Sequence, residues 1–374
     1  MHKIDYEEFF KHHDKTDFEN DYLIALGWKK YNKGVLEHTT RYKTLNEKYI
    51  KLKESYSCYS WLQKLFLPSE LAELVIYNYE KLIQVFINLY LEKYNIPDTF
   101  KNNFREIVSY DDFSTSIRKF FAEQADELGI YSCAYCECAY TGSYEIINKK
   151  GETKEKGFFD LDHFFPKEEY PIFALCLYNF VPCCQICNSK RIKGDTPLLK
   201  FYNIDATNLN KAQEQLLLVS PISNKYRFDK DIFIRYFPKV EIIEPEKTTK
   251  KSKKNSKIDN ATKYKEWHYS LLSQSSAESY QVFFDCDFTK AENKSAEIKK
   301  AMKLDERYNS LAIKSKGLYL LDLRKKYPLS NIKMLSNLFA KSKYYISPEE
   351  IENAIFHKNE KNILLEKMTK DILE

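Results

Sequence analysis

Two Cys-x-x-Cys pairs constrain the fold of this chain more than any other feature of its sequence. They are Cys133 with Cys136 and Cys184 with Cys187, in a chain of 374 residues that contains nine cysteines. A Cys-x-x-Cys turn directs two thiolates at one point, so two such turns complete a tetrahedral zinc site. A closed site of four thiolates stabilises a small fold and does no chemistry itself. We therefore predict a structural Zn²⁺ centre held by these four cysteines.

Two further cysteines lie beside these pairs, and each could replace a neighbour as ligand: Cys138 and Cys183. The equal spacing within the two pairs favours the pairs themselves. The opening sequence MHKIDYEEFFKHHDKTDFEN has no apolar signal segment, and no run of about 18 apolar residues occurs. We expect a cytoplasmic protein without a membrane segment, in which cysteines are thiols or metal ligands rather than disulfides.

Composition limits what can surround such a centre. Hydrophobic residues make up 43% of the chain and aromatic residues 15%, which excludes a disordered protein. Only 8 Gly and 11 Pro are present, which disfavours a turn-dense all-β fold. We predict an α+β protein of three parts: a helical N-terminal domain over residues 1–128, a zinc-containing module over residues 129–201, and a mixed, mainly helical α/β extension over residues 202–374.

The N-terminal part has the clearest helical signals. Apolar residues recur at three- and four-residue steps over residues 69–94, which predicts one helix facing the core. A second helix is predicted over residues 114–129, with Ser114 as its N-cap and Gly129 just past its end. This helix leads directly into the first cysteine pair.

The C-terminal part combines strand and helix signals. Runs rich in β-branched and aromatic residues predict short strands over residues 214–220, 231–237, 239–244 and 280–286. Helices are expected after Thr289, and the last of them starts at a capping box formed by Ser347 and Glu350, with Pro348 as its first residue. Residues 246–257 contain six lysines and no apolar residue, which is typical of a solvated loop or a phosphate-binding arm.

Between the cysteine pairs lies a group of polar residues suited to hydrolysis of a phosphodiester. Asp162 and His163 end an apolar strand, and Asn179 and Asn188 follow. A neutral imidazole can take a proton from water, and carboxylate and amide oxygens can bind a hard divalent cation beside it. Asp160 lies on the same face of the strand as Asp162 and could supply the carboxylate instead.

The segments CAYC, DLDHFFPK, YNFVPCC and CNSKRIKGD together resemble the HNH endonuclease motif, in the branch that carries paired Cys-x-x-Cys turns. This resemblance covers residues 131–200 and implies a ββα-metal finger. More widely, CAYCE, HFFPK, LLLVSP and MKLDERYNSLAIK are similar to HNH subunits of bacterial anti-phage systems such as Septu and the retron-associated nucleases.

The resemblance also implies a role for each polar residue of the group. His163 would be the general base that activates water. Asp162 and Asn188 would be ligands of a catalytic Mg²⁺ or Mn²⁺, and Asn179 would orient the loop that carries the histidine. Asn188 stands where the motif often has histidine, and its amide oxygen can still bind a metal.

Several basic residues are candidates for binding phosphate. Lys167 follows the Asp-His motif, and Lys190, Arg191 and Lys193 follow the second cysteine pair. The lysine of the usual Cys-Asn-x-x-Lys pattern is displaced here, so which of these last three meets the phosphate stays open. The net charge of +5 is compatible with a nucleic-acid partner without requiring one.

The sequence therefore predicts a metal-dependent HNH endonuclease that acts on DNA. An RNase of toxin type, cleaving RNA or tRNA with the same site, is an alternative, because the motif carries no information on the 2′-hydroxyl. A non-catalytic zinc ribbon that binds nucleic acid is another, although it would leave Asp162 and His163 without a task. The anti-phage resemblance implies a partner ATPase or regulatory subunit, and the oligomeric state stays open.

Overall fold

The computed structural model describes residues 3–57, 62, 67–91, 97–147, 151, 153–189, 192, 208–226, 232–238, 280–286, 302–338, 340, 345–356 and 368–370. The described residues form two compact units, and each contains helices and at least one two-stranded sheet. The chain is thus a mixed α+β protein, as predicted. Some predicted features lie outside the described residues: strand 239–244, segment 246–257, Lys190, Arg191 and Lys193.

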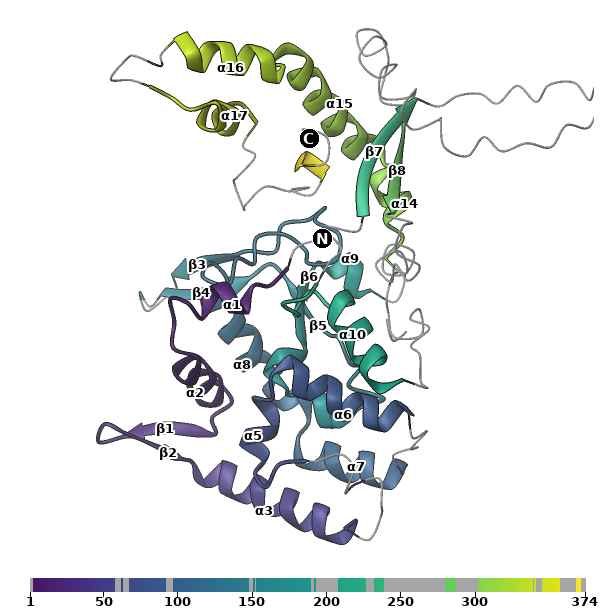
Figure 1. The fold of residues 1–374 in the computed structure, drawn as a ribbon. Helices are drawn as coiled ribbons and strands as arrows, with labels where there is room; N and C mark the ends of the chain where they lie inside the picture. Colours follow the sequence, from purple (N-terminus) through teal and green to yellow (C-terminus); the bar gives the residue numbers. More distant parts are fainter. Residues whose placement is uncertain are drawn as a thin grey trace, which may run out of the picture. The chain divides into compact units, whose positions relative to one another are not determined.

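The first unit takes in the described residues up to 226 (Figure 1). Its N-terminal elements are α1 (Tyr6–Phe9), α2 (Lys15–Ala25), β1 (Lys29–Asn32), β2 (Val35–His38), α3 (Thr40–Ser55), α5 (Leu71–Val75), α6 (Tyr79–Leu91), α7 (Asp98–Ile107) and α8 (Tyr110–Glu123). The later elements are β3 (Ser143–Ile147), β4 (Thr153–Gly157), β5 (Asp160–His163), η1 (Pro171–Phe173), η2 (Leu177–Asn179), β6 (Phe180–Cys183), α9 (Gln185–Asn188) and α10 (Leu209–Val219). Among the helices that the structure describes, none is long and apolar enough to cross a membrane.

Residues 69–94 contain two helices where one helix was predicted. The side chain of Asn78 accepts a hydrogen bond from the backbone N–H of Lys81 at 2.9 Å, so α6 starts afresh with its own N-cap. The apolar periodicity is nevertheless the core-facing side of α6, whose fully buried residues include Leu82, Ile83 and Phe86.

Helix α8 begins earlier than predicted. Its N-cap position is Ser109, while Ser114 lies inside the helix and donates a hydrogen bond from its hydroxyl to the Asp111 carbonyl at 3.1 Å. The predicted end of the helix is wrong, since α8 ends at Glu123 with Gln124 as its C-cap. Gly129 instead closes a separate turn after the helix: its φ is +67°, and the N–H groups of Gly129 and Ile130 donate to carbonyls of that turn at 3.1 and 2.8 Å.

The N-terminal region is not helical throughout, because β1 and β2 form an antiparallel hairpin. Asn32 pairs with Val35 at its tip, and the two turn residues Lys33 and Gly34 both have positive φ, 49° and 84°. This is the conformation of a tight hairpin turn. The turn was missed because a lysine rarely adopts positive φ.

The segment between the cysteine pairs forms two hairpins and a short helix. β3 pairs with β4, and β5 pairs antiparallel with β6 in a register that runs from Asp160 opposite Cys183 to His163 opposite Phe180. Helix α9 follows β6 immediately, with Cys184 at its N-cap. The order is therefore strand, strand, helix, built from β5, β6 and α9.

The loop after β5 packs into the N-terminal helices. Phe164 and Phe165 are fully buried, and the ring of Phe165 stacks on that of Phe86 in α6 with centroids 4.7 Å apart. The hydroxyl of Tyr22 in α2 donates to the carbonyl of Leu175 at 2.7 Å. Residues from both sides of the predicted boundary at 128/129 therefore pack in one aromatic core. This core supports the loop after β5.

The predicted strand over residues 214–220 is wrong, since this stretch belongs to helix α10. The Asn208 side chain accepts a hydrogen bond from the N–H of Lys211 at 3.1 Å and so caps the helix. Helix α10 packs against α6, and the Tyr79 hydroxyl donates to the Leu216 carbonyl at 3.3 Å. The apolar run over residues 214–220 is too short to show a clear period, so its sequence does not distinguish a strand from a helix. Packing against α6 favours the helix.

The second unit contains a β-hairpin and helices, and residues 368–370 are helical as well. The elements are β7 (Ile232–Pro238), β8 (Tyr280–Cys286), α14 (Leu304–Tyr308), α15 (Leu311–Lys326), α16 (Leu329–Leu338) and α17 (Pro348–Phe356). β7 and β8 pair antiparallel, which confirms the predicted strands over residues 231–237 and 280–286. The predicted capping box is confirmed as well: the Ser347 N–H donates to Glu350 Oε2 at 2.7 Å, and the Glu350 N–H to Ser347 Oγ at 3.1 Å.

Candidate metal centre and active site

The four cysteines of the two Cys-x-x-Cys pairs come together in the structure. Cys133, Cys136, Cys184 and Cys187 are all buried, and their sulfur atoms lie within 4.8 Å of one another. The sulfurs of Cys136 and Cys184 are 3.9 Å apart. A tetrahedral zinc ion with Zn–S bonds of about 2.3 Å needs sulfurs about 3.8 Å apart. The donor type and spacing therefore fit a zinc ion bound by these four side chains.

Hydrogen bonds around the sulfurs favour the thiolate form. The backbone N–H of Cys138 donates to Cys136 Sγ at 3.4 Å, and that of Cys187 donates to Cys184 Sγ at 3.5 Å. Hydrogen bonds within the group, first those with Cys133, lower the pKa of Cys136 and lower the pKa of Cys184 to about 6. Burial raises the pKa of Cys133. The anionic form that binds a metal is thus stabilised at one cysteine from each pair.

The two alternative cysteine ligands are not in the group of four that the described residues form. The thiol of Cys138 turns back toward the Cys136 carbonyl, at 3.0 Å. Cys183 lies on β6 opposite Asp160 and is buried in the sheet. The equal spacing of the pairs therefore identified the cluster that the fold assembles.

β5 ends with the Asp-His pair, and both side chains are buried. His163 Nε2 lies 2.9 Å from the Ala174 carbonyl oxygen, and its ring contacts those of Tyr110 and Phe180 with centroids 4.7 and 5.0 Å apart. A neutral imidazole that donates to a carbonyl from Nε2 carries its lone pair on Nδ1. The carbonyl and the two rings thus hold the imidazole in one orientation and one tautomer.

Asn179 clamps the loop that follows His163. It is fully buried, its Oδ1 accepts from the N–H of Phe165 at 2.8 Å, and its Nδ2 donates to the carbonyls of Phe165 and Phe173 at 3.0 Å each. The Phe164 N–H also donates to the Asn179 backbone carbonyl at 2.9 Å. These bonds tie the loop to the start of β6, directly beside the histidine.

Asp162 is linked to the cysteine centre through Tyr135, the third residue of the first Cys-x-x-Cys turn. The fully buried Tyr135 donates from its hydroxyl to Asp162 Oδ2 at 2.6 Å. A hydrogen bond of this kind fixes the orientation of the carboxylate. The sequence analysis missed this contact, although the position of Tyr135 between two metal ligands was a signal that could have indicated it.

Asn188, at the end of α9, contacts the other carboxylate of β5. Its Nδ2 donates to Asp160 Oδ2 at 3.3 Å, and Asp160 Oδ1 lies 3.6 Å from the Arg118 guanidinium. Asp160 and Asp162 are two positions apart in a strand, so they lie on one face. Asp160 and the Asn188 amide thus meet beside β5, and carboxylate and amide oxygens are the hard donors that suit Mg²⁺ or Mn²⁺.

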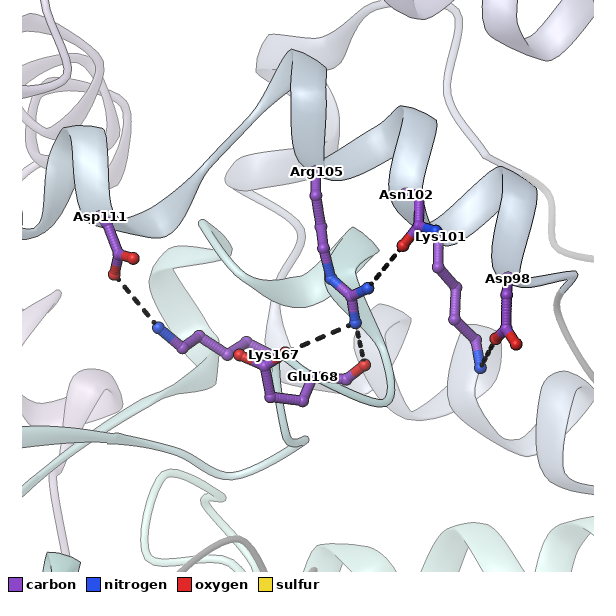
Figure 2. A network of polar contacts seen from close by, with 7 residues as sticks. All are labelled: Asp98, Lys101, Asn102, Arg105, Asp111, Lys167 and Glu168. Carbon is purple, nitrogen blue, oxygen red and sulfur yellow. Dashed lines mark hydrogen bonds and ion pairs between the residues drawn. The ribbon is translucent and has the colours of Figure 1, made fainter.

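Lys167 lies at the edge of the site, where helices α7 and α8 hold its loop (Figure 2). Its ammonium is 3.4 Å from Asp111 Oδ1 and 4.4 Å from the centre of the Tyr110 ring. The guanidinium of Arg105 in α7 binds the backbone carbonyl of Glu168 and lies 3.5 Å from its carboxylate. Both helices precede the cysteine module in the chain, and no local motif indicates that they reach this loop.

The comparisons with known proteins add one partial similarity. No family model matches this chain, and no solved structure matches it. The class of the protein therefore comes from its own structure, which is an α+β fold with a candidate four-cysteine metal centre. A segment is similar to the Septu protein PtuB of Bacillus thuringiensis, with 29% identity over 70 residues. The match spans 19% of this chain and 23% of the Septu protein.

Proposed function

We propose that this chain is a metal-dependent endonuclease of the HNH type that hydrolyses phosphodiester bonds in DNA. The setting of His163 carries the proposal: the ring is held by the Ala174 carbonyl at 2.9 Å and follows the buried carboxylate of Asp162 directly. The order of β5, β6 and α9 around a four-cysteine centre is also the order that the HNH resemblance implies. A zinc-binding scaffold needs neither the buried histidine nor the clamp formed by Asn179.

In this proposal His163 acts as a base through Nδ1, since Nε2 is directed at a carbonyl. The imidazole takes a proton from water, the oxygen of that water forms a bond to phosphorus, and the bond from phosphorus to the 3′ oxygen breaks. The leaving oxygen is protonated by solvent. Asp162 and Asn188 would hold a divalent cation, Mg²⁺ or Mn²⁺, which would supply positive charge beside the phosphate. Asp160 is the alternative carboxylate, because it already contacts Asn188.

Asn179 contributes by positioning in this proposal. Its three side-chain hydrogen bonds fix the backbone of Phe165, two residues after the histidine, and of Phe173, directly before the Ala174 carbonyl that orients the histidine. Geometry held in this way lowers the entropy that must be lost when the reacting groups are aligned. The asparagine would therefore affect the rate without touching the substrate.

The biological setting that we propose is bacterial anti-phage defence. The partial similarity to a Septu protein supports it, together with the wider resemblance of HFFPK and LLLVSP to HNH subunits of such systems. By the same resemblance, a partner ATPase or regulatory subunit would control the nuclease. Lys167, Lys190, Arg191 and Lys193 would contact the nucleic-acid backbone.

The test is cleavage by the purified full chain, with plasmid DNA, linear DNA and tRNA as substrates. Each substrate is incubated with Mg²⁺, Mn²⁺ or EDTA, with and without the product of the neighbouring gene. We expect cleavage of DNA that EDTA abolishes and that His163→Ala lowers by about 100-fold or more. His12→Ala is the matched control, since the His12 side chain is 72% exposed and lies in a different part of the fold.

Any other result of this experiment would identify a different function for the chain. Cleavage of tRNA without cleavage of DNA would identify the RNase of toxin type. Binding of nucleic acid without any cleavage, under all these conditions, would identify the non-catalytic zinc ribbon. Wild-type cleavage by His163→Ala would refute the assignment of the histidine.

A further inference from the structure

Tyr110, the first residue of α8, lies at the centre of the polar groups around His163. The edge of its ring meets the His163 ring at 4.7 Å and 79°, and the ammonium of Lys167 lies 4.4 Å from its centroid. Burial raises the pKa of the Tyr110 hydroxyl, and the charge and hydrogen bond of Arg118 oppose that rise. Tyr110 thus contacts the candidate base and two cations.

Arg118 lies two turns after Tyr110 in α8. Its guanidinium lies beside Asp160, the carboxylate that Asn188 contacts. Its guanidinium is 3.6 Å from Asp160 Oδ1, and Asp160 Oδ2 accepts from Asn188. The Arg118 side chain is 56% exposed, whereas that of Asp160 is 25% exposed. The guanidinium therefore faces solvent at the edge of the site, while its planar group of five N–H donors suits a phosphate.

Both cations are held by ion pairs that a ligand could replace. Asp111, which pairs with Lys167, is 85% exposed, and Figure 2 shows its carboxylate directed at the Lys167 ammonium. Ion pairs between exposed groups contribute little to stability. A phosphate that approaches His163 can therefore take the place of Asp111 beside Lys167 at little loss to the fold, and it can meet the exposed part of the Arg118 guanidinium.

We propose that Arg118 is a phosphate-binding residue of this site, positioned by Tyr110, and that it acts with Lys167 as a pair of cations around the ring that contacts His163. The inference rests on the proposed nuclease function and adds to it a residue from outside the cysteine module. The ligand is the sugar–phosphate backbone of a nucleic acid. Contacts of this kind fix the position of a strand and carry no sequence preference.

The test is the salt dependence of DNA binding, measured with a short fluorescent duplex in a His163→Ala background, in which we expect cleavage to be about 100-fold slower. Arg118→Ala should weaken binding about equally for unrelated sequences and lower the log–log salt slope by about one. Lys119→Ala is the matched control on the same helix, since Lys119 pairs with Glu123 and is 62% exposed. It should have a smaller effect on the slope.

Two further variants separate phosphate binding from a structural role. Arg118→Gln keeps a long polar side chain without charge, and it should lower the slope as much as Arg118→Ala while leaving zinc content and the melting temperature unchanged. Tyr110→Phe removes only the hydroxyl beside Arg118. Its effect on binding should not add to that of Arg118→Ala, because one group acts through the other.

The outcomes distinguish this inference from the proposed function. If wild-type protein cleaves DNA and both Arg118 variants bind and cleave like Lys119→Ala, the role of Arg118 is refuted and the nuclease stands. If wild-type protein cleaves nothing but the Arg118 variants still lower the salt slope, the nuclease is refuted and the phosphate site stands. Absence of both binding and cleavage would overturn both.

Discussion

The hydrogen bond from Tyr135 to Asp162 gives a direct test of how the cysteine centre is coupled to the candidate active site. Tyr135→Phe removes one hydroxyl and keeps a ring that is fully buried. The lost bond is 2.6 Å long, buried, and accepted by a carboxylate. Hydrogen bonds to charged groups are worth about 1.5–3 kcal/mol, so we expect the free energy of unfolding to fall by about 2 kcal/mol.

Denaturant and thermal unfolding measure this loss of stability. The amount of zinc released to a chelator measures whether the four cysteines still bind the metal. A loss of about 2 kcal/mol lowers the melting temperature of a unit of about 150–250 residues by about 4–8 °C. The zinc content should not change, because all four thiolates remain. Tyr131→Phe is the matched control, since the Tyr131 hydroxyl donates to the Asp126 carbonyl at 2.7 Å in an exposed position. Its loss should stay below about 0.5 kcal/mol.

Activity gives a second readout of the same contact. If the carboxylate binds the catalytic ion, Tyr135→Phe should raise the Mn²⁺ concentration needed for half-maximal cleavage by about 10–100-fold, and high Mn²⁺ should restore the rate. Equal stability of the Tyr135→Phe and Tyr131→Phe variants, within about 0.5 kcal/mol, would refute the coupling. So would loss of zinc from the Tyr135→Phe protein, since that result would place the hydroxyl in the metal centre.

Three further predictions follow from the site. Cys184→Ala should lose zinc and unfold the module, while Cys138→Ala keeps both, as zinc analysis and thermal unfolding will report. His163→Ala should keep zinc and stay within about 1 kcal/mol of wild-type stability while cleavage falls by about 100-fold; equal cleavage rates would refute its role. Deletion of residues 247–257 should flatten the salt dependence of DNA binding, measured by titration, and an unchanged slope would identify an inert loop.

Signals that act over a few residues were sufficient for several local features. The capping box at Ser347 and Glu350 was predicted correctly, because its hydrogen bonds join residues three positions apart. The spacing of the cysteines likewise predicted the four sulfurs that meet. A Cys-x-x-Cys turn directs its own two thiolates, so only the meeting of the two turns needed the tertiary fold.

Signals failed where a distant partner determines the local structure. Residues 214–220 are helical because α10 packs on α6, and the apolar run itself does not distinguish a strand from a helix. The predicted helix over residues 69–94 is divided because the Asn78 side chain caps a new start. The apolar residues of this stretch were nevertheless correctly placed in the core, since burial depends on composition more than on conformation.

In the candidate site, too, some features could be predicted from the sequence and others depend on tertiary contacts. The sequence by itself determined its chemical groups: four thiols, an imidazole next to a carboxylate, and an asparagine that holds a loop. Only the tertiary structure decided which groups meet, because Asp160 rather than Asp162 contacts Asn188, and Tyr110 and Arg118 reach the site from a helix outside the module. These contacts join residues that are far apart in the chain, and the packing of α8 beside the module, not a local preference of the backbone, brings them together.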